Sequence, residues 1–220
     1  MGRQKQDQWV AEEALPGRRD GFFLDLAATD GIAYNNTWVL EREFGWTGIA
    51  VEPNLAYFNA LKQNRLCVCV PDCIDEGEGT VDFLINGELG GIVGEDTDNK
   101  NDVRPEFVER VREKGLLQTL KTRSLLDVLE HHNAPSVIDY FSFDVEGAET
   151  RILRSFPFEK YTFLSLTIER PSPEINEALF RHGYLFVRNV ASDSFYVHES
   201  APTATTIARE PFAQQPPKRP

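Results

Sequence analysis

The chain has 220 residues, of which 41% are hydrophobic and 11% aromatic, a composition typical of a globular protein and not of a disordered one. Its 35 acidic residues outnumber its 23 lysines and arginines, so the formal net charge is −12. That charge disfavours binding to nucleic acid and to anionic membrane surfaces. We therefore expect the partner to be a small molecule or a glycan.

The first part of the chain alternates between helices and strands. Residues 7–15 predict a short amphipathic helix that ends at Pro16-Gly17. Gly21–Leu26 is an apolar run before a turn of small residues, which is typical of a strand buried on both faces. The following elements are expected to be a helix from Asn35 or Asn36 to Gly45, a strand at Thr47–Val51, a helix at Ala56–Gln63 and a strand at Leu66–Val70.

The middle of the chain is less regular. Gly87–Asp102 is rich in Gly, Asp and Asn, and its length suggests a binding loop or a lid. Around it the expected elements are a strand at Val81–Ile85, a helix at Pro105–Lys114, a strand at Gln118–Lys121 and a helix at Leu125–His131 capped by Ser124.

The last third resumes the alternation, with a strand at Val137–Asp144, a helix after it, a strand at Thr162–Ile168 and a helix at Glu174–Arg181. Leu185–Asn189 and Phe195–His198 predict a closing hairpin. Together the elements predict an α/β fold with a mostly parallel sheet and an antiparallel edge hairpin. We expect one domain over residues 1–200 and a disordered tail over residues 201–220.

The three cysteines, Cys67, Cys69 and Cys73, lie close together. Cys67 and Cys69 are expected to be small apolar residues of a strand, and no further Cys or His pair follows at zinc-binding spacing. An odd cysteine count, without a signal peptide or a membrane-length apolar run, predicts a cytoplasmic location.

Ligands of open α/β sheets bind beyond the carboxyl ends of the strands. Asp25 and the turn Ala27–Gly31 follow the first expected strand, and small residues there let backbone N–H groups approach a ligand. The turn lacks the G-x-G-x-x-G pattern, and its acids would repel a pyrophosphate but suit a cationic ligand such as a sulfonium with an α-ammonium group. The alternative is an ordinary tight turn with a capping aspartate.

Two further acids follow the next two strands. Glu52 can accept both hydroxyl groups of a ribose, with Pro53 turning the chain into the next helix, although a helix-capping role is the alternative. Asp72 can accept a hydrogen bond from an adenine amino group, with Cys73 beside the ring. The alternative for Asp72 is a solvated loop acid.

Asp144 and Glu146 follow the fourth core strand, beside a glycine, and Glu169 ends the next strand. Neighbouring strand ends are expected to bring Asp144 and Glu169 close together, where they could hold a divalent cation or act as a base. Acids favoured by a helix dipole are the alternative for the first pair. We predict no bound metal.

The chain resembles the FkbM-type S-adenosylmethionine-dependent methyltransferases from about Asp7 to Tyr196. Several blocks in order carry the resemblance: GFFLDLAATDG (21–31), Asn36-Thr37 with Leu40-Glu41, GWTGIAVEPN (45–54), Asn64–Cys67, DYFSFDVEGAE (139–149) and Thr167–Glu169.

This resemblance implies a Rossmann-like class I methyltransferase fold with seven strands, S-adenosyl-L-methionine as cofactor, and O-methylation of a hydroxyl on a sugar or natural product. It places Asp25, the 27–31 turn and Glu52 around the cofactor and marks Asp144 and Glu146 as residues near the reaction centre. The expected cofactor contacts are Asp25, Ala27, Ala28, Asp30, Gly31, Asn36, Thr37, Glu52, Pro53, Asp72, Cys73 and Asp144. We expect Asp144 to face the methyl group and the acceptor, and Glu146 and Glu169 to orient the acceptor.

Two departures from the family pattern stand in the first block. Ala27 occupies a position where the family usually has Gly, and Asn35 one where Ser often precedes Asn-Thr. A Cβ resists positive φ, so Ala27 favours the alternative that the domain kept the fold for interaction and lost catalysis. A nicotinamide oxidoreductase is a third hypothesis, which the missing glycine pattern and the acidic turn disfavour.

Overall fold

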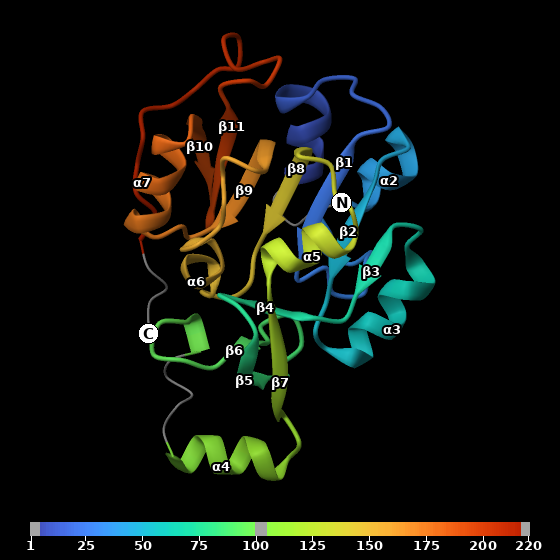
Figure 1. Ribbon diagram of the computed structural model, residues 1–220, viewed down its shortest axis with the longest axis vertical. Coiled ribbons are helices and arrows are strands. Elements are labelled where there is room, and N and C mark those ends of the chain that lie inside the picture. Colours follow the sequence, from blue (N-terminus) through green and yellow to red (C-terminus); the bar gives the residue numbers. More distant parts are fainter. Residues whose placement is uncertain (1–4, 100–104, 217–220) are drawn as a thin grey trace.

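The computed structural model describes residues 5–99 and 105–216. Its largest feature is a seven-stranded sheet with the strand order β10-β11-β9-β8-β1-β2-β3 (Figure 1). These strands are β1 (Phe22–Leu26), β2 (Thr47–Val51), β3 (Val68–Val70), β8 (Val137–Phe143), β9 (Thr162–Glu169), β10 (Tyr184–Val190) and β11 (Asp193–His198).

The first five of these strands pair in parallel, while β11 pairs antiparallel with both β9 and β10. The predicted fold class is thereby confirmed, including the antiparallel edge hairpin. Leu26 at the end of β1 lies level with Val51 of β2 and with Phe143 of β8. The residues that follow these three strands, Ala27, Glu52 and Asp144, therefore emerge side by side at one edge of the sheet.

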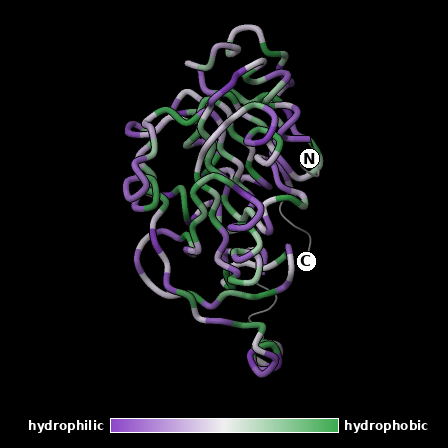
Figure 2. Tube along the Cα trace, turned by 90° about the vertical axis from the view of Figure 1, so that its right-hand side faces the viewer, coloured by the Kyte–Doolittle hydropathy of each residue, from purple (hydrophilic) through white to green (hydrophobic). Residues whose placement is uncertain are grey.

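Alternating side chains of the central strands fill two cores, one on each face of the sheet. Leu24 and Phe141 belong to one core, whereas Phe23 and Tyr140 belong to the other. The helices outside the sheet are α2 (Trp38–Phe44), α3 (Leu55–Asn64), α5 (Leu125–His131), α6 (Glu149–Leu153) and α7 (Pro173–Arg181). Hydrophobic residues concentrate toward the centre of the molecule and hydrophilic residues along its periphery (Figure 2).

A second, smaller sheet has the order β4-β7-β5-β6, formed by β4 (Cys73–Asp75), β5 (Gly79–Leu84), β6 (Gly91–Ile92) and β7 (Leu117–Ser124). Helix α4 (Pro105–Glu113) lies beyond it, at the bottom of Figure 1. The sequence did not predict β4 or β6, because two or three residues carry no periodicity and these strands depend on their partners. Side chains of both sheets share one core cluster, so we propose that they form a single domain.

The ends of the chain pack onto the main sheet. The predicted N-terminal helix appears as α1 (Gln6–Trp9) continued by a π-helix, η1 (Val10–Ala14), and Trp9 packs edge-on against Phe195 at 4.9 Å. Residues 201–216 differ from the predicted disordered tail, because Ala201 and Ala204 are buried in the same core as Trp9. Residues 217–220 of that prediction lie outside the described residues. None of the described helices has the length and apolarity needed to cross a membrane.

Candidate active site

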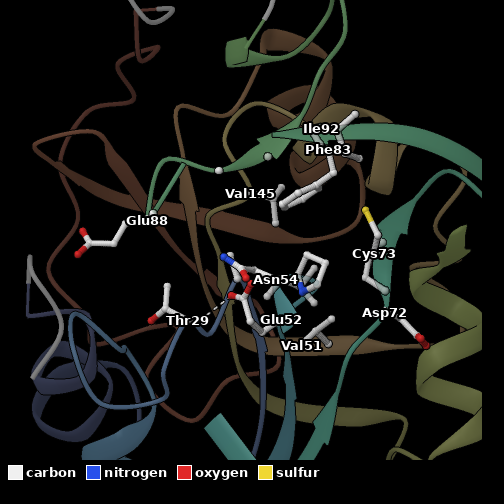
Figure 3. A pocket seen from close by; sticks show the side chains of 18 residues that line it. Thr29, Val51, Glu52, Asn54, Asp72, Cys73, Phe83, Glu88, Ile92 and Val145 are labelled. Atoms are coloured by element: carbon white, nitrogen blue, oxygen red, sulfur yellow. Dashed lines mark hydrogen bonds between the residues drawn. The ribbon is translucent and has the colours of Figure 1, made fainter. Parts of the chain in front are cut away.

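Two adjoining cavities lie at the carboxyl ends of β1, β2 and β8. The turn after β1 separates them, since Ala27 and Thr29 line both. The small cavity extends past Glu52 toward Cys73 and the second sheet (Figure 3). The large cavity, of about 330 Å³, extends toward the ends of β8 and β9.

The turn between the cavities is strained. Ala27 has φ +62° and Thr29 has φ +50°, both in the left-handed region that residues with a Cβ disfavour. For a β-branched residue such as Thr29 this conformation is an outlier. The Thr29 N–H donates a 2.9 Å hydrogen bond to Oε2 of Glu52, so the strained turn is held by a carboxylate of the site itself.

The conformation of Ala27 gives a direct prediction. Ala27→Gly should raise the free energy of unfolding by roughly 1 kcal/mol, because glycine adopts φ +62° without the steric cost of a Cβ. Urea denaturation of both proteins measures the difference.

Ala28→Gly is the matched control at the next position. Ala28 is 1% exposed and its φ is not positive, so this change should lower the free energy of unfolding by roughly 1 kcal/mol. A destabilising Ala27→Gly would show that the turn does not need its left-handed conformation.

Glu52 is 4% exposed, and each of its carboxylate oxygens accepts one backbone N–H. Oε2 accepts from Thr29 at 2.9 Å and Oε1 from Asn54 at 2.8 Å. Burial raises the pKa of Glu52 to about 7, although the two N–H donors act in the opposite direction. Each oxygen retains acceptor capacity on the side of the small cavity, which suits two neighbouring hydroxyl groups of a ligand.

The far part of the small cavity is apolar. Cys73 is buried there, and Figure 3 shows it at the opposite end of the cavity from Thr29 and Glu88. The predicted adenine contact Asp72 lines this region, but its carboxylate points away from Glu52 and pairs with Nη1 of Arg123 at 2.9 Å. The apolar wall comes from Phe83, Ile92, Val145 and Ala148. These residues were not predicted from the sequence, since Phe83 and Ile92 reach the site only through the second sheet.

Asp25 lies in the wall of the large cavity and is 3% exposed. Its Oδ2 accepts hydrogen bonds from Thr37 Oγ1 at 2.7 Å and from Asn35 Nδ2 at 2.9 Å. Burial raises the pKa of Asp25, while the charge of Arg65 and these hydrogen bonds act to lower it. Much of the acceptor capacity of Asp25 is therefore used within the protein, to hold the turn between β1 and α2.

Arg65, which was not predicted as a site residue, completes this buried network. Its side chain is 0% exposed and lies 5.2 Å over the Phe23 ring. The guanidinium donates to Asn35 Oδ1 and Thr37 Oγ1, each at 3.0 Å, and to Glu41 at 3.2 Å. One cation thus joins the end of α3 to the start of α2 beneath the turn.

Some predicted cofactor contacts lie outside both cavities. Among the described residues, Ala28, Asp30, Gly31 and Thr37 do not line either cavity. Asp30 Oδ1 accepts the N–H groups of Ile32 and Ala33, and the Ala28 carbonyl accepts from Asn35. These residues shape the turn, whereas the predicted contacts Ala27, Asn36, Glu52, Pro53, Cys73 and Asp144 line the cavities.

The predicted catalytic acids Asp144, Glu146 and Glu169 all line the large cavity. Asp144 borders the space of the cavity, whereas Glu146 is buried and has φ +55°. The carboxyl groups of Asp144 and Glu169 lie close together, and burial together with neighbouring negative charges raises the pKa of both. Such a pair is suited to hold and release a proton near neutral pH.

Acidic groups also gather on either side of this pair. Oxygens of Asp98, Glu146 and Glu169 lie within 4.8 Å of one another, and so do those of Asp144, Glu149 and Glu169. Arg170 contacts the first group, with Nη2 at 2.8 Å from Asp98 and 2.6 Å from Glu169. The positive charge of Arg170 therefore already offsets part of the negative charge of that group. The absence of a bound metal stays a prediction.

The large cavity also contains residues that sequence reasoning did not find, namely Gln6, Ser142, Arg170 and Asp193. Asn36, which was predicted, donates to Ser142 Oγ at 2.9 Å. Its Oδ1 is buried without a hydrogen-bond partner in the described part of the chain. This unpaired acceptor beside the cavity fits a ligand that brings a donor, such as an α-ammonium group.

Comparison with known proteins identifies a family. Residues 25–189 match the family described as Methyltransferase FkbM domain, as the sequence resemblance predicted. Among solved structures, the chain is similar to the METTL16 MTase domain, with a TM-score of 0.43 and 12% identity over 87% of this chain and 64% of that one. It is also similar to the delta-N METTL16 MTase domain, with a TM-score of 0.42 and 13% identity over 87% of this chain and 78% of that one. No curated protein matches the sequence.

Proposed function

Because the chain belongs to the FkbM methyltransferase domain family, we propose that it is an S-adenosyl-L-methionine-dependent enzyme that O-methylates a sugar or another small natural product. The observation that carries this proposal is the arrangement of the two cavities. A buried carboxylate suited to a ribose lies on one side of the turn, and the neighbouring carboxyl groups of Asp144 and Glu169 lie on the other.

The small cavity suits the adenosyl part of the cofactor. Glu52 offers both oxygens to the ribose hydroxyls, and the apolar wall around Phe83 and Ile92 suits an adenine ring. From the large cavity, on the other side of the turn, the unpaired Oδ1 of Asn36 can accept from the α-ammonium group of the cofactor. Asp72 is occupied by Arg123, so we assign it no contact with the adenine amino group.

The large cavity suits the acceptor. When bound, S-adenosylmethionine supplies an electrophilic methyl group next to a positive sulfur. Asp144 faces this region from the end of β8, and with Glu169 it can take the proton of an acceptor hydroxyl. Glu146 and Arg170 line the same cavity, and we assign them the role of orienting the hydroxyl groups of the acceptor.

Substitution of Asp144 tests this assignment. Asp144→Asn should lower turnover by about 100-fold or more, because an amide cannot accept the proton, while the cofactor still binds. Methyl transfer to a panel of sugars and hydroxylated natural products measures turnover, and calorimetry measures cofactor affinity. Glu130→Gln, which removes an exposed carboxylate from α5, is the control. Wild-type turnover in Asp144→Asn would reject the role of this residue.

The strained Ala27 favours a second candidate function, a non-catalytic interaction domain that retained the fold. Calorimetry with S-adenosylmethionine separates the two, as does mass spectrometry of the purified protein for a co-purified adenosyl ligand. Absence of binding heat and of a thermal shift with the wild-type chain would support the interaction domain.

A further inference from the structure

Part of the wall of the large cavity comes from outside the segment that matches the family. The match covers residues 25–189, whereas Gln6 and Asp193 both line the cavity and lie beyond it. These two residues come from opposite ends of the chain and meet, since Gln6 Nε2 donates to Asp193 Oδ2. Both are buried, with 4% of each exposed.

Two turns carry the polar groups of this wall. The first follows β9 and contains Arg170, and the second joins β10 to β11 and leads to Asp193. They are tied together by a 2.9 Å hydrogen bond from the Arg170 N–H to the Ser192 carbonyl. Arg170 has φ +40° and Ala191 has φ +50°, so each turn holds a strained residue that needs support from its surroundings.

Residues 209–216, which we name the terminal strap, supply that support. Gln214 Nε2 donates to the Pro171 carbonyl at 2.7 Å, directly after Arg170. Gln215 Nε2 donates to the Ala191 carbonyl at 3.0 Å and lies 3.4 Å from the Asp193 carbonyl oxygen. The strap therefore binds the backbone of both turns by side-chain amide donors.

The strap is itself fixed to the outer helix and the edge strand. The Phe212 ring packs edge-on against Phe180 of α7 and Phe186 of β10, at 5.0 and 5.3 Å. Asn189 Nδ2 donates to the Ala213 carbonyl at 2.8 Å. Figure 1 shows the chain after β11 passing over the top of the sheet and then running beside α7.

We propose that the two chain ends hold the acceptor wall of the active site, with Gln6, Gln214 and Gln215 as positioning residues for Arg170 and Asp193. The guanidinium of Arg170 and the carboxylate of Asp193 then bind hydroxyl groups of the acceptor as donor and acceptor. This inference rests on the proposed function for its use of the large cavity. It assigns acceptor recognition partly to segments outside residues 25–189. The residues proposed to bind the cofactor lie inside that range.

The test is a full-length variant carrying Gln214→Ala and Gln215→Ala, compared with Glu210→Ala, an exposed position on the same strap. Hydrogen exchange at the Arg170 amide, followed by NMR, should become about tenfold faster in the double variant, because the turn loses its support. The carboxyl titration of Glu169 should move to higher pH as Arg170 shifts, since the guanidinium charge lowers the pKa of Glu169. Amides of the 27–31 turn and the dissociation constant of the cofactor should change less than about twofold.

Unchanged Arg170 exchange or an unmoved Glu169 titration would overturn the inference. Uniformly faster exchange throughout the chain would overturn it too, because it would show that the strap serves only general stability. Cofactor calorimetry on the wild-type sample keeps the two proposals distinct. If the wild-type chain binds no S-adenosylmethionine, the proposed function is wrong. The role of the strap is decided separately, by the exchange experiment.

Discussion

Replacing Glu52 with Gln is expected to raise the dissociation constant for S-adenosylmethionine by about 10- to 100-fold. One oxygen becomes an amide NH₂ that faces either the Thr29 or the Asn54 N–H, where the carboxylate accepted a hydrogen bond. The variant therefore loses an acceptor for a ribose hydroxyl and also loosens the strained turn between the cavities. Isothermal titration calorimetry measures the change.

Asp72→Asn is the matched control, because Asp72 follows the neighbouring strand but pairs with Arg123 and points away from Glu52 (Figure 3). Its effect on the dissociation constant should stay below about threefold, as expected for a partly exposed ion pair. If Asp72→Asn weakened binding as much as Glu52→Gln, the assignment of the ribose to Glu52 would be wrong.

The same residue gives cofactor binding a pH signature. Burial raises the pKa of Glu52 to about 7, and the ionised form is the one that accepts two hydroxyl groups. Affinity should therefore fall as the pH is lowered from 8 to 6, by about tenfold from this group alone. Glu52→Gln removes this component, so its affinity should depend less steeply on pH than that of the wild type.

Arg65→Ala is expected to lower the free energy of unfolding by about 3 to 5 kcal/mol. The substitution leaves the Glu41 carboxylate, 7% exposed, without its cation. It also removes the donors to Asn35 and Thr37, which hold Asp25, so the turn after β1 should loosen. Urea denaturation measures the stability.

Arg65→Lys keeps the positive charge but loses the forked set of N–H donors. It should lower the free energy of unfolding by less than Arg65→Ala does. Arg42→Ala is the surface control, since Arg42 is exposed and donates to the Asn64 carbonyl. Arg42→Ala should change the free energy of unfolding by no more than about 0.5 kcal/mol. Equal stabilities of Arg65→Ala and Arg42→Ala would show that the buried network adds nothing to the fold.

Local sequence determined most of the main sheet. Strand Thr47–Val51 and helix Leu125–His131 have the bounds that the sequence predicts, because apolar runs, a capping serine and turn residues act over short distances. Sequence also placed Glu52, Asp144 and Glu169 at one edge of the sheet, since parallel strands align their carboxyl ends. The family resemblance followed from the same blocks.

Tertiary structure decided what those residues contact. Whether an acid faces a cavity or a cation depends on partners distant in sequence, such as Arg123 for Asp72 and Thr37 for Asp25. Ala27 has a positive φ that an alanine does not favour by itself, and its turn is anchored to Glu52 through the Thr29 N–H. The terminal strap shows no hydrophobic periodicity, so its position could not be predicted from the sequence. Only its side-chain amide hydrogen bonds to the turns around Arg170 and Asp193 show where it packs. Periodicity reports which face of an element is buried, whereas the partner of a polar side chain is fixed only when the elements pack together.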